Sequence, residues 1–262
     1  MDNEDYHEDN VGLPSQSDID QWQRENDRWQ KARLHHYLAR KYLSEYDSIY
    51  ERITAQDVEK LISIINNSDR EEDIQAFLAS HPTFLTHHLG GGSGRYCIPK
   101  KNLGGMFIPD FLIADLNSFG IKWCAVELKN PKTRMFNKNG NRSKDLNEAI
   151  RQIGNYRDWL KNNLNEARNP KQKMGHGLIG IEPELKCLIL IGRRKDIDEG
   201  LDDTRIRMNR EINGEIRTYD WLIEQAKDEF VRVETREFGR KLREELEIQG
   251  KYRHIDISDI EQ

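Results

Sequence analysis

The spacing of apolar side chains predicts helices along the first 80 residues. Over residues 17–52, aromatic and aliphatic residues recur at roughly helical spacing, which predicts one long helix. Such a stripe packs either on the protein's own core or on a second subunit. Capping patterns predict two further helices, one beginning at Thr54 with Asp57 three residues later, the other beginning at Ser68 with Glu71 three residues later. The stripe of the long helix comprises Trp22, Trp29, Leu38, Tyr42, Tyr46 and Ile49.

Shorter apolar segments farther along the chain predict strands. Residues 108–115 and 123–129 are separated by a short polar turn that a glycine closes, which is typical of an antiparallel hairpin. Further strands are expected at Tyr96, 187–191 and 215–219. The longest apolar segment, 187–191, is far too short to span a membrane, so we expect no membrane association.

Helical spacing returns after the hairpin. An amphipathic helix is expected over 145–165, where apolar residues recur three and four positions apart. Gln152 and Tyr156 lie four positions apart on it and therefore share one face. A charged helix is expected at 204–211, and a long terminal helix from Thr218 onward. The apolar positions of the first of these helices are Leu146, Ala149, Ile150, Ile153, Tyr156, Leu160 and Leu164.

Two carboxylates and a lysine on the predicted hairpin are the main candidates for chemistry. Side-chain alternation directs Glu127 and Lys129 to one face of their strand, and the hairpin brings Asp110 toward Glu127. Carboxylate oxygens suit Mg²⁺ better than His or Cys would, so we expect Asp110 and Glu127 to be metal ligands. A second Glu-Leu-Lys triplet at 184–186 lacks an upstream Pro-Asp strand and stands before its apolar segment, so we interpret it as a chance copy.

These residues carry a resemblance to a known superfamily. Pro109-Asp110, then Glu127-Leu128-Lys129, then Gln152 and Tyr156 on the next helix resemble the PD-(D/E)xK nucleases with a Q-x-x-x-Y feature. Over about 69–219 the chain is similar to the nuclease domain of Shedu-type antiphage defence proteins. The resemblance rests on the runs EEDIQAFLASHPTFL, GGGSGRY, IPDFLIAD, VELKNPK, FNKNGN and LNEAIRQI.

The resemblance implies a fold and an activity. The expected fold is an α/β restriction-endonuclease-like core, a mixed central sheet flanked by helices, with helical N- and C-terminal extensions. The expected activity is Mg²⁺-dependent DNA cleavage in antiphage or antiplasmid defence, with Mn²⁺ as a substitute metal and a homo-oligomeric assembly. The expected catalytic residues are Asp110, Glu127, Lys129 and Gln152. Lys129 would orient or deprotonate the attacking water, Gln152 would hold that water or Lys129, and Tyr156 would contact the DNA backbone.

Charge is distributed unevenly along the 262 residues. The first 30 residues hold nine acids and two bases, a net charge of −7 against −5 for the whole chain, so the remainder is +2. The loop 130–144 carries five bases and no acid directly after the candidate strand, which predicts a DNA-backbone contact surface. An ordinary polar loop is the alternative. The five bases are Lys132, Arg134, Lys138, Arg142 and Lys144.

We expect four segments: a disordered acidic tail at 1–16, a helical region at 17–66, the nuclease domain at 67–222 and a helical extension at 223–262. The N-terminus lacks an apolar signal region and the three cysteines are widely spaced, so a cytoplasmic protein with reduced thiols is expected. The glycine run near residue 92 lacks a phosphate-loop Lys-Ser/Thr, so no nucleotide cofactor is expected.

Several alternatives remain open at this level. Glu71 is either a helix cap or a further acid of the metal site, and Asp115 is expected to be structural. A repair or restriction-type nuclease would use the same core. A non-catalytic DNA-binding protein on a nuclease fold is the rival from another functional class.

Overall fold

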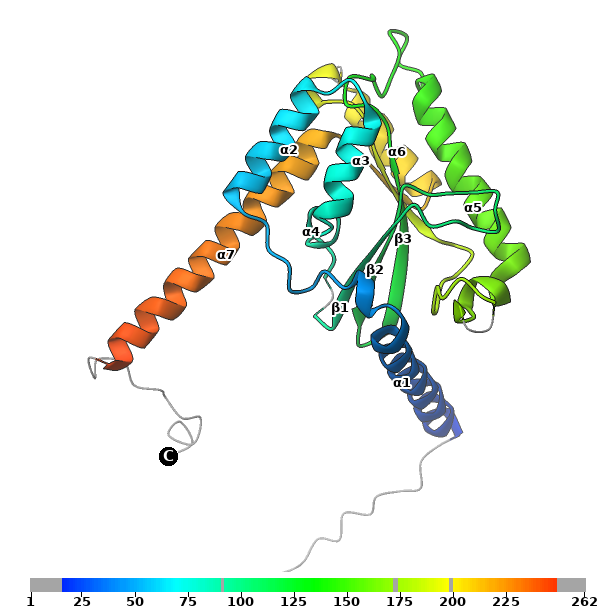
Figure 1. Ribbon diagram of the computed structural model, residues 1–262. Coiled ribbons are helices and arrows are strands. Elements are labelled where there is room, and N and C mark those ends of the chain that lie inside the picture. The colour runs from blue at the N-terminus through cyan, green and yellow to red at the C-terminus, as the bar shows by residue number, and fades with distance from the viewer. Residues whose placement is uncertain (1–15, 91, 172–173, 198–199, 249–262) are drawn as a thin grey trace, which may run out of the picture.

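The computed structural model describes residues 16–90, 92–171, 174–197 and 200–248. Their elements form an α/β arrangement in which helices cover both faces of one sheet (Figure 1). Apart from Gln16, the predicted acidic tail lies outside the described residues, as do residues 249–262 of the predicted C-terminal extension.

The sheet is mixed, as the family resemblance implies. Its described strands are β1 (Gly94–Pro99), β2 (Phe111–Asn117), β3 (Gly120–Leu128), β4 (Lys186–Leu190) and β5 (Gly214–Arg217), in the order β1-β2-β3-β4-β5. β1, β2 and β3 pair antiparallel, whereas β3, β4 and β5 pair parallel. Parallel neighbours need crossover connections, and helices supply them: α5 (Lys144–Arg168) joins β3 to β4, and α6 (Leu201–Glu211) joins β4 to β5.

The predicted hairpin is confirmed. β2 and β3 pair from Phe111 opposite Val126 to Asn117 opposite Gly120, so two residues make the turn. Gly120 has a φ of +101°, a conformation that favours glycine. This register aligns the start of β2 with the end of β3, which carries Asp110 toward Glu127.

Each face of the sheet has its own hydrophobic core. Alternating residues of β3, such as Trp123 and Ala125, pack with α5, whereas Val126 and Leu128 pack on the opposite side with α2 (Ala55–Asn67) and its neighbours. That opposite layer also contains α3 (Glu71–Ser80), α4 (Thr83–Thr86) and α7 (Tyr219–Ile248), as Figure 1 shows. Each large apolar side chain buried this way contributes roughly 1.5–3 kcal/mol.

The first helix is shorter than predicted. α1 spans Gln16–Tyr42, and a 3-10 turn at Ser44–Tyr46 replaces the expected continuation to Arg52. The predicted aromatic stripe also divides. Leu38, Tyr42 and Tyr46 pack against the core on the α5 side of the sheet, whereas Trp22 and Trp29 are exposed.

The two predicted capping boxes have different outcomes. At α2, the Thr54 hydroxyl accepts from the backbone N–H of Asp57, whose carboxylate accepts from Thr54, so this box is confirmed. At α3 the prediction is wrong, because the helix begins at Glu71 and Arg70 precedes it without a side-chain cap. Ser68 instead donates to the Asp73 carboxylate at 2.7 Å. Glu71 therefore has no capping role.

The remaining boundaries shift by a few residues. α5 confirms the amphipathic helix expected over 145–165, and α6 begins three residues before the predicted start. β5 ends at Arg217, two residues before the predicted end of the strand, and α7 begins at Tyr219, one residue after the predicted start of the terminal helix. Tyr219 is fully buried there, in the core formed with α2, α3 and α4.

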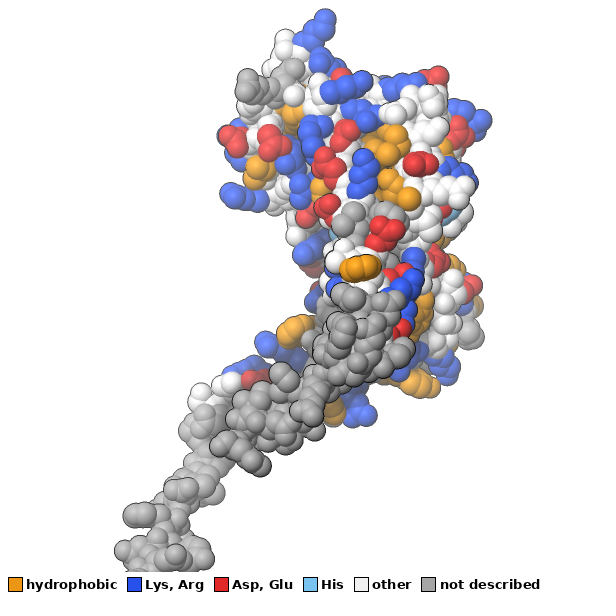
Figure 2. All heavy atoms as spheres, turned by 90° about the vertical axis from the view of Figure 1, so that its left-hand side faces the viewer, with side chains coloured by type: hydrophobic (Ala, Val, Ile, Leu, Met, Phe, Trp, Pro, Cys, Tyr) orange, Lys and Arg blue, Asp and Glu red, His pale blue; other side chains and the backbone are white. Residues whose placement is uncertain are grey.

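The described surface has no large field of one charge sign on the side of α2 and α7. Figure 2 shows basic and acidic side chains interspersed over that side, with small apolar areas between them. No helix in the described part of the chain is long and apolar enough to cross a membrane. Cys97, Cys124 and Cys187 are free thiols, as predicted.

Candidate active site

One edge of the sheet gathers the predicted chemical residues. Asp110 immediately precedes β2, Glu127 lies near the end of β3, and Lys129 follows that strand. The first turn of α3 and the first turn of α5 lie at the same edge, at the top of Figure 1. Side chains from separate elements therefore converge there.

Asp110 is held by groups from two neighbouring strands. One carboxylate oxygen, Oδ2, accepts from the backbone N–H of Leu128 at 2.8 Å. The other, Oδ1, accepts from the Lys100 ammonium at 2.5 Å. Lys100 directly follows β1 and also donates its backbone N–H to the Asp110 carbonyl at 2.9 Å. The Asp110 side chain is consequently fixed between β1 and β3, and the residue is only 7% exposed.

Glu127 is the most deeply buried acid of this group, with 2% exposure. Its Oε1 accepts from the Tyr156 hydroxyl at 2.7 Å. Burial raises the pKa of Glu127 to about 8, and the nearby Asp110 charge adds to the increase, whereas the Tyr156 bond and Lys129 oppose it. At neutral pH this carboxyl is largely protonated unless a cation is present to stabilise the charge.

The face of α5 explains why Tyr156 reaches Glu127. Side-chain alternation directs Glu127 to the α5 side of the sheet, and the apolar stripe of α5 presses Tyr156 against that side. Burial raises the pKa of the Tyr156 phenol above its ordinary value. Tyr156, predicted to contact DNA, is buried in this arrangement, and its hydroxyl donates to Glu127.

Gln152 lies one helical turn before Tyr156, as predicted. It is half-buried, and its side-chain oxygen is buried without a hydrogen-bond partner among the described residues. A buried acceptor of this kind costs free energy unless something donates to it. The unsatisfied oxygen is suited to receive a proton donor such as a water molecule or an ammonium group.

Glu71 joins the group from the first turn of α3. Burial raises the pKa of Glu71 to about 7; the positive charges of Lys129 and Lys100 oppose that shift, and Asp110 reinforces it. Lys129 is partly exposed, and its backbone N–H donates to the Leu190 carbonyl at 2.8 Å. Glu71, Lys100 and Lys129 thus form the partly exposed rim of a group whose inner members are Asp110 and Glu127.

Tyr219 lies beneath the same group and was not predicted. Its side chain is fully buried, its hydroxyl has no hydrogen-bond partner among the described residues, and its pKa is raised well above the ordinary value by burial and by Glu71 and Asp110. Neither Tyr219 nor Lys100 belongs to a spacing pattern that relates it to Asp110. The left-handed backbone of Lys100, with φ of +46°, has no signal in the sequence either.

The predicted DNA-binding loop is more constrained than its composition suggests. Lys132 is ion-paired with Asp69, and Arg142 contacts Glu211 at 2.7 Å. The loop is also anchored, because Met135 and Phe136 are buried in the core beside α5. Lys138, Arg134 and Lys144 are exposed. Lys132 and Arg142 are therefore engaged with acids from other segments.

The second Glu-Leu-Lys triplet lies away from this group. Lys186 opens β4 opposite Cys124, whereas the candidate residues lie at the opposite end of that strand pair. Asp115 accepts from the Asn117 side chain at 2.8 Å beside the hairpin turn, in line with the structural role expected for it.

The donor set suits a hard cation that keeps part of its water shell. No three His, Cys, Asp or Glu side chains in the described ranges are grouped closely enough to hold a metal by themselves. Mg²⁺ is commonly bound by one or two carboxylates together with water and substrate phosphate, so Asp110 and Glu127 fit that mode. The charge of such an ion would favour the ionised form of Glu127.

Comparison with known protein families gives one match. The family model described as Shedu protein SduA, C-terminal, matches residues 68–223, a range that contains Glu71, Asp110, Glu127, Lys129 and Tyr219. No curated protein matches the chain.

Proposed function

Because the chain belongs to the Shedu protein SduA C-terminal family, whose membership implies a role in antiphage defence, we propose that it is a Mg²⁺-dependent DNA endonuclease with a PD-(D/E)xK-type core. The observation that carries this proposal is the convergence of Asp110 and a buried Glu127 with pKa raised to about 8, next to Lys129. Strongly perturbed acids beside a lysine are typical of catalytic sites. Defence is favoured over repair by the family match alone.

Asp110 and Glu127 would hold the metal ion, with Mg²⁺ preferred and Mn²⁺ able to replace it. When bound, the ion would lower the pKa of a water molecule and stabilise charge on the scissile phosphate. Tyr156 donates to Glu127 and would favour its ionised form. Glu71, free of a capping role, is a further candidate for orienting water near the metal.

Lys129 and Gln152 would act on the attacking water and the phosphate. The Lys129 ammonium offsets negative charge on the phosphate oxygens and orients the nucleophile. The unsatisfied side-chain oxygen of Gln152 would accept a hydrogen bond from that water or from Lys129. Both groups stand on rigid elements, which keeps the reacting atoms aligned.

DNA would approach over the loop 130–144. Lys138, Arg134 and Lys144 are exposed there and supply sequence-independent attraction to phosphates. The ion pairs of Lys132 with Asp69 and Arg142 with Glu211 involve exposed groups, and such pairs are weak enough for a phosphate to compete with the acid.

One assay tests the enzymatic proposal directly. Plasmid and linear DNA are incubated with Mg²⁺ and either the native chain, Glu127→Gln or Lys129→Ala. We expect both variants to lose at least ~100-fold in cleavage rate while folding and DNA binding persist, because only groups acting on the reaction are removed.

The second triplet supplies matched controls. Glu184→Gln and Lys186→Ala change the same residue types in the same local sequence at the other end of β4, and both should cleave DNA at the native rate. Mg²⁺-dependent cleavage by the Lys129→Ala variant at the native rate would contradict the assignment.

A non-catalytic DNA-binding function is the second candidate, and one observation favours it. Both carboxylate oxygens of Asp110 already accept hydrogen bonds from the protein, as in a purely structural charge cluster. Titration with Mg²⁺ separates the two functions. A catalytic site should bind the ion and raise the unfolding temperature, whereas a structural cluster should show no response to Mg²⁺ and no cleavage.

A further inference from the structure

The first half of α1 is largely exposed to solvent along its described length. Among the described side chains from Gln16 to Lys31 none is buried, and Ala32 is the first residue of α1 that packs inward. Figure 1 shows this segment projecting beyond the sheet. Isolated helices of this length are marginal in water, and most helices gain stability by burying one face. The projecting segment therefore needs a partner.

Large apolar side chains lie along one side of this helix. Trp22 and Trp29, seven positions apart, share a face and are 65% and 54% exposed, and Tyr37 is 60% exposed. Toward the C-terminal end of α1 the same side forms a shallow groove of about 680 Å³. Its lining includes Trp29, Arg33, His36, Tyr37, Arg40 and, from the β2–β3 turn, Ser118.

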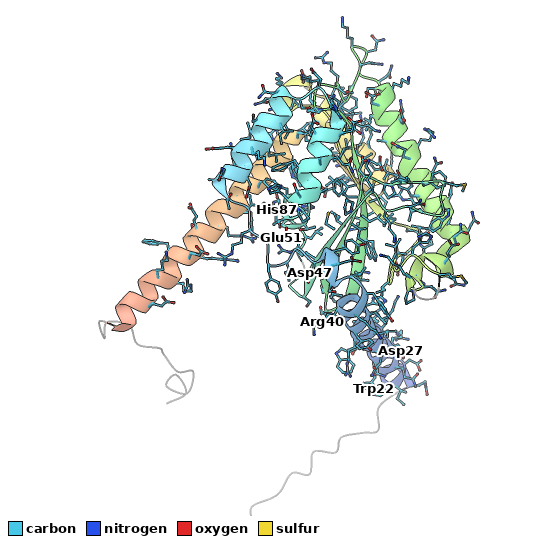
Figure 3. The ribbon with its side chains drawn as sticks, in the orientation of Figure 1. Trp22, Asp27, Arg40, Asp47, Glu51 and His87 are labelled. Carbon is cyan, nitrogen blue, oxygen red and sulfur yellow. The ribbon has the colours of Figure 1, made fainter. Side chains whose placement is uncertain are left out.

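Opposite charges are segregated along α1. Residues 16–27 hold four acids and one base, whereas residues 28–42 hold five bases and no acid. Figure 3 shows Asp27 and Trp22 toward the free end of the helix and Arg40 toward the body of the protein. Arg40 makes no ion pair with an acid in the described part of the chain, and Lys31 has only a 3.7 Å contact with Glu182. Within the described part of the chain, most of the charge on each half of α1 therefore has no ion-pair partner of opposite sign.

We propose that α1 is an interface between two copies of this chain, paired antiparallel about a two-fold axis near residue 30. The projecting acidic half of one copy then lies in the basic groove of the other, and the exchange is reciprocal, as a two-fold interface requires. A parallel pair would instead place acid beside acid and base beside base. Each helix is about 40 Å long, so the pairing covers the projecting segment completely.

This arrangement also covers the exposed aromatic residues. In the antiparallel register, Trp22 of one copy reaches the segment around Arg40 of the other, and the two Trp29 side chains meet within about one helical turn of each other. Tryptophan beside arginine gains from cation–π attraction, which α1 already uses where Arg33 lies 4.6 Å from the Trp29 ring centre.

Other possible partners would match the charge of only one half of α1. The acidic residues 1–15 of the same chain match the basic groove in charge, but they would leave the acidic half of α1 without a basic partner. Nucleic acid would be attracted to the groove and repelled by residues 16–27. A second copy complements both halves at once.

The test measures molecular mass in solution. The full chain should be a dimer in sedimentation equilibrium at micromolar concentration, and the double variant Trp22→Ala/Trp29→Ala should raise the dimer dissociation constant at least 100-fold. The control Phe238→Ala removes a ring that is 69% exposed on α7 and should leave the dimer intact. An unchanged thermal unfolding temperature for the core shows that the variants are folded.

A charge exchange tests the antiparallel orientation. Asp20→Lys/Glu25→Lys changes the net charge of residues 16–27 from −3 to +1, and Arg33→Glu/Arg40→Glu/Lys41→Glu changes that of residues 28–42 from +5 to −1. Each variant alone should be monomeric, and an equimolar mixture should form a heterodimer, because both contacts become complementary again. A monomeric native chain, a dimer unaffected by these changes, or a dimer that appears only after deletion of residues 1–15 would overturn the proposal.

Discussion

The Lys100 ammonium forms an ion pair with the Asp110 carboxylate, although the two residues are ten positions apart and lie on different segments. The ammonium is 2.5 Å from Asp110 Oδ1, on the oxygen that the Leu128 N–H leaves open. A cation entering the site must therefore compete with Lys100 for the same oxygen. The protein provides its own counter-charge where the proposed metal would bind.

Replacing Lys100 should consequently strengthen metal binding. In Lys100→Met we expect Mg²⁺ to bind several-fold more tightly at pH 8, because Asp110 loses its competing ammonium. Isothermal titration calorimetry measures the change. Lys101→Met is the matched control, since the Lys101 ammonium donates to the His176 carbonyl and not to Asp110. Equal or weaker Mg²⁺ affinity in Lys100→Met would contradict this competition.

The raised pKa of Glu127 predicts how stability depends on pH. In the unfolded chain its pKa is about 4.3, and in the folded protein it is about 8. The folded state therefore holds this proton more strongly, and the associated stability is present below about pH 4 and lost as the pH rises through 8. Without metal, the unfolding temperature should fall more between pH 5 and 8.5 in the native chain than in Glu127→Gln.

That comparison isolates the carboxyl from other titrating groups. Burial lowers the pKa values of His87 and His88, so their ionisation acts in the opposite direction at low pH in both proteins. Thermal melts in EDTA at matched pH give the difference between native and variant chains. Parallel pH profiles for the two proteins would show that Glu127 does not carry this proton.

At the scale of elements, the starts of α2 and α3 differ in whether nearby polar side chains cap the helix. α2 begins with a capping box, whereas α3 begins without one, although both sequences carry the same spacing. At α3, Ser68 bonds to Asp73 and to the backbone of Arg70 instead. Glu71 therefore makes no capping hydrogen bond, and its carboxyl can take part in the candidate site.

Two alanine substitutions distinguish these helix starts. Thr54→Ala should lower the free energy of unfolding by about 1 kcal/mol, because it removes the acceptor for the Asp57 N–H. Ser68→Ala should cost less, since its contacts are exposed and do not cap α3. Urea denaturation of both variants measures the difference, and equal losses would argue that Ser68 also supports its helix.

At the scale of the whole molecule, the local charge near the candidate site differs in sign from the net charge of −5. The first 30 residues carry a net charge of −7, while the exposed bases of the loop 130–144 lie next to the candidate site. Sequence-independent binding to phosphates follows the local charge, because exposed charges more than about 10 Å apart are largely screened at 0.1 M salt. A net acidic chain is thus compatible with DNA binding at one edge.

Salt dependence should report how many loop cations contact DNA. Lys138→Ala/Lys144→Ala should reduce the slope of log affinity against log salt by about 1–2, since each lost phosphate contact removes roughly 0.9. Fluorescence anisotropy at several salt concentrations gives the slope. Lys161→Ala, on the exposed surface of α5 beside Asp158, should leave it unchanged. An unaltered slope for the double variant would place the DNA elsewhere.

Short-range patterns in the sequence determined the hairpin, the amphipathic α5 and the common face of Gln152 and Tyr156, because alternation and helical periodicity act within one or two elements. The hairpin register then brings Asp110 beside Glu127 without further information. These features depend on neighbours in the chain, so their spacing is sufficient to predict them.

Only the tertiary structure decided the contacts between distant segments. Lys100 binds Asp110 from the segment after β1, and Glu71 of α3 and Tyr219 of α7 lie near enough to interact with its charge. Packing on two faces of the sheet buries Tyr156, pairs Lys132 with Asp69, and leaves Trp22 and Trp29 of α1 exposed. No periodicity relates such residues, because their proximity depends on how layers stack and on which side chains lose contact with water.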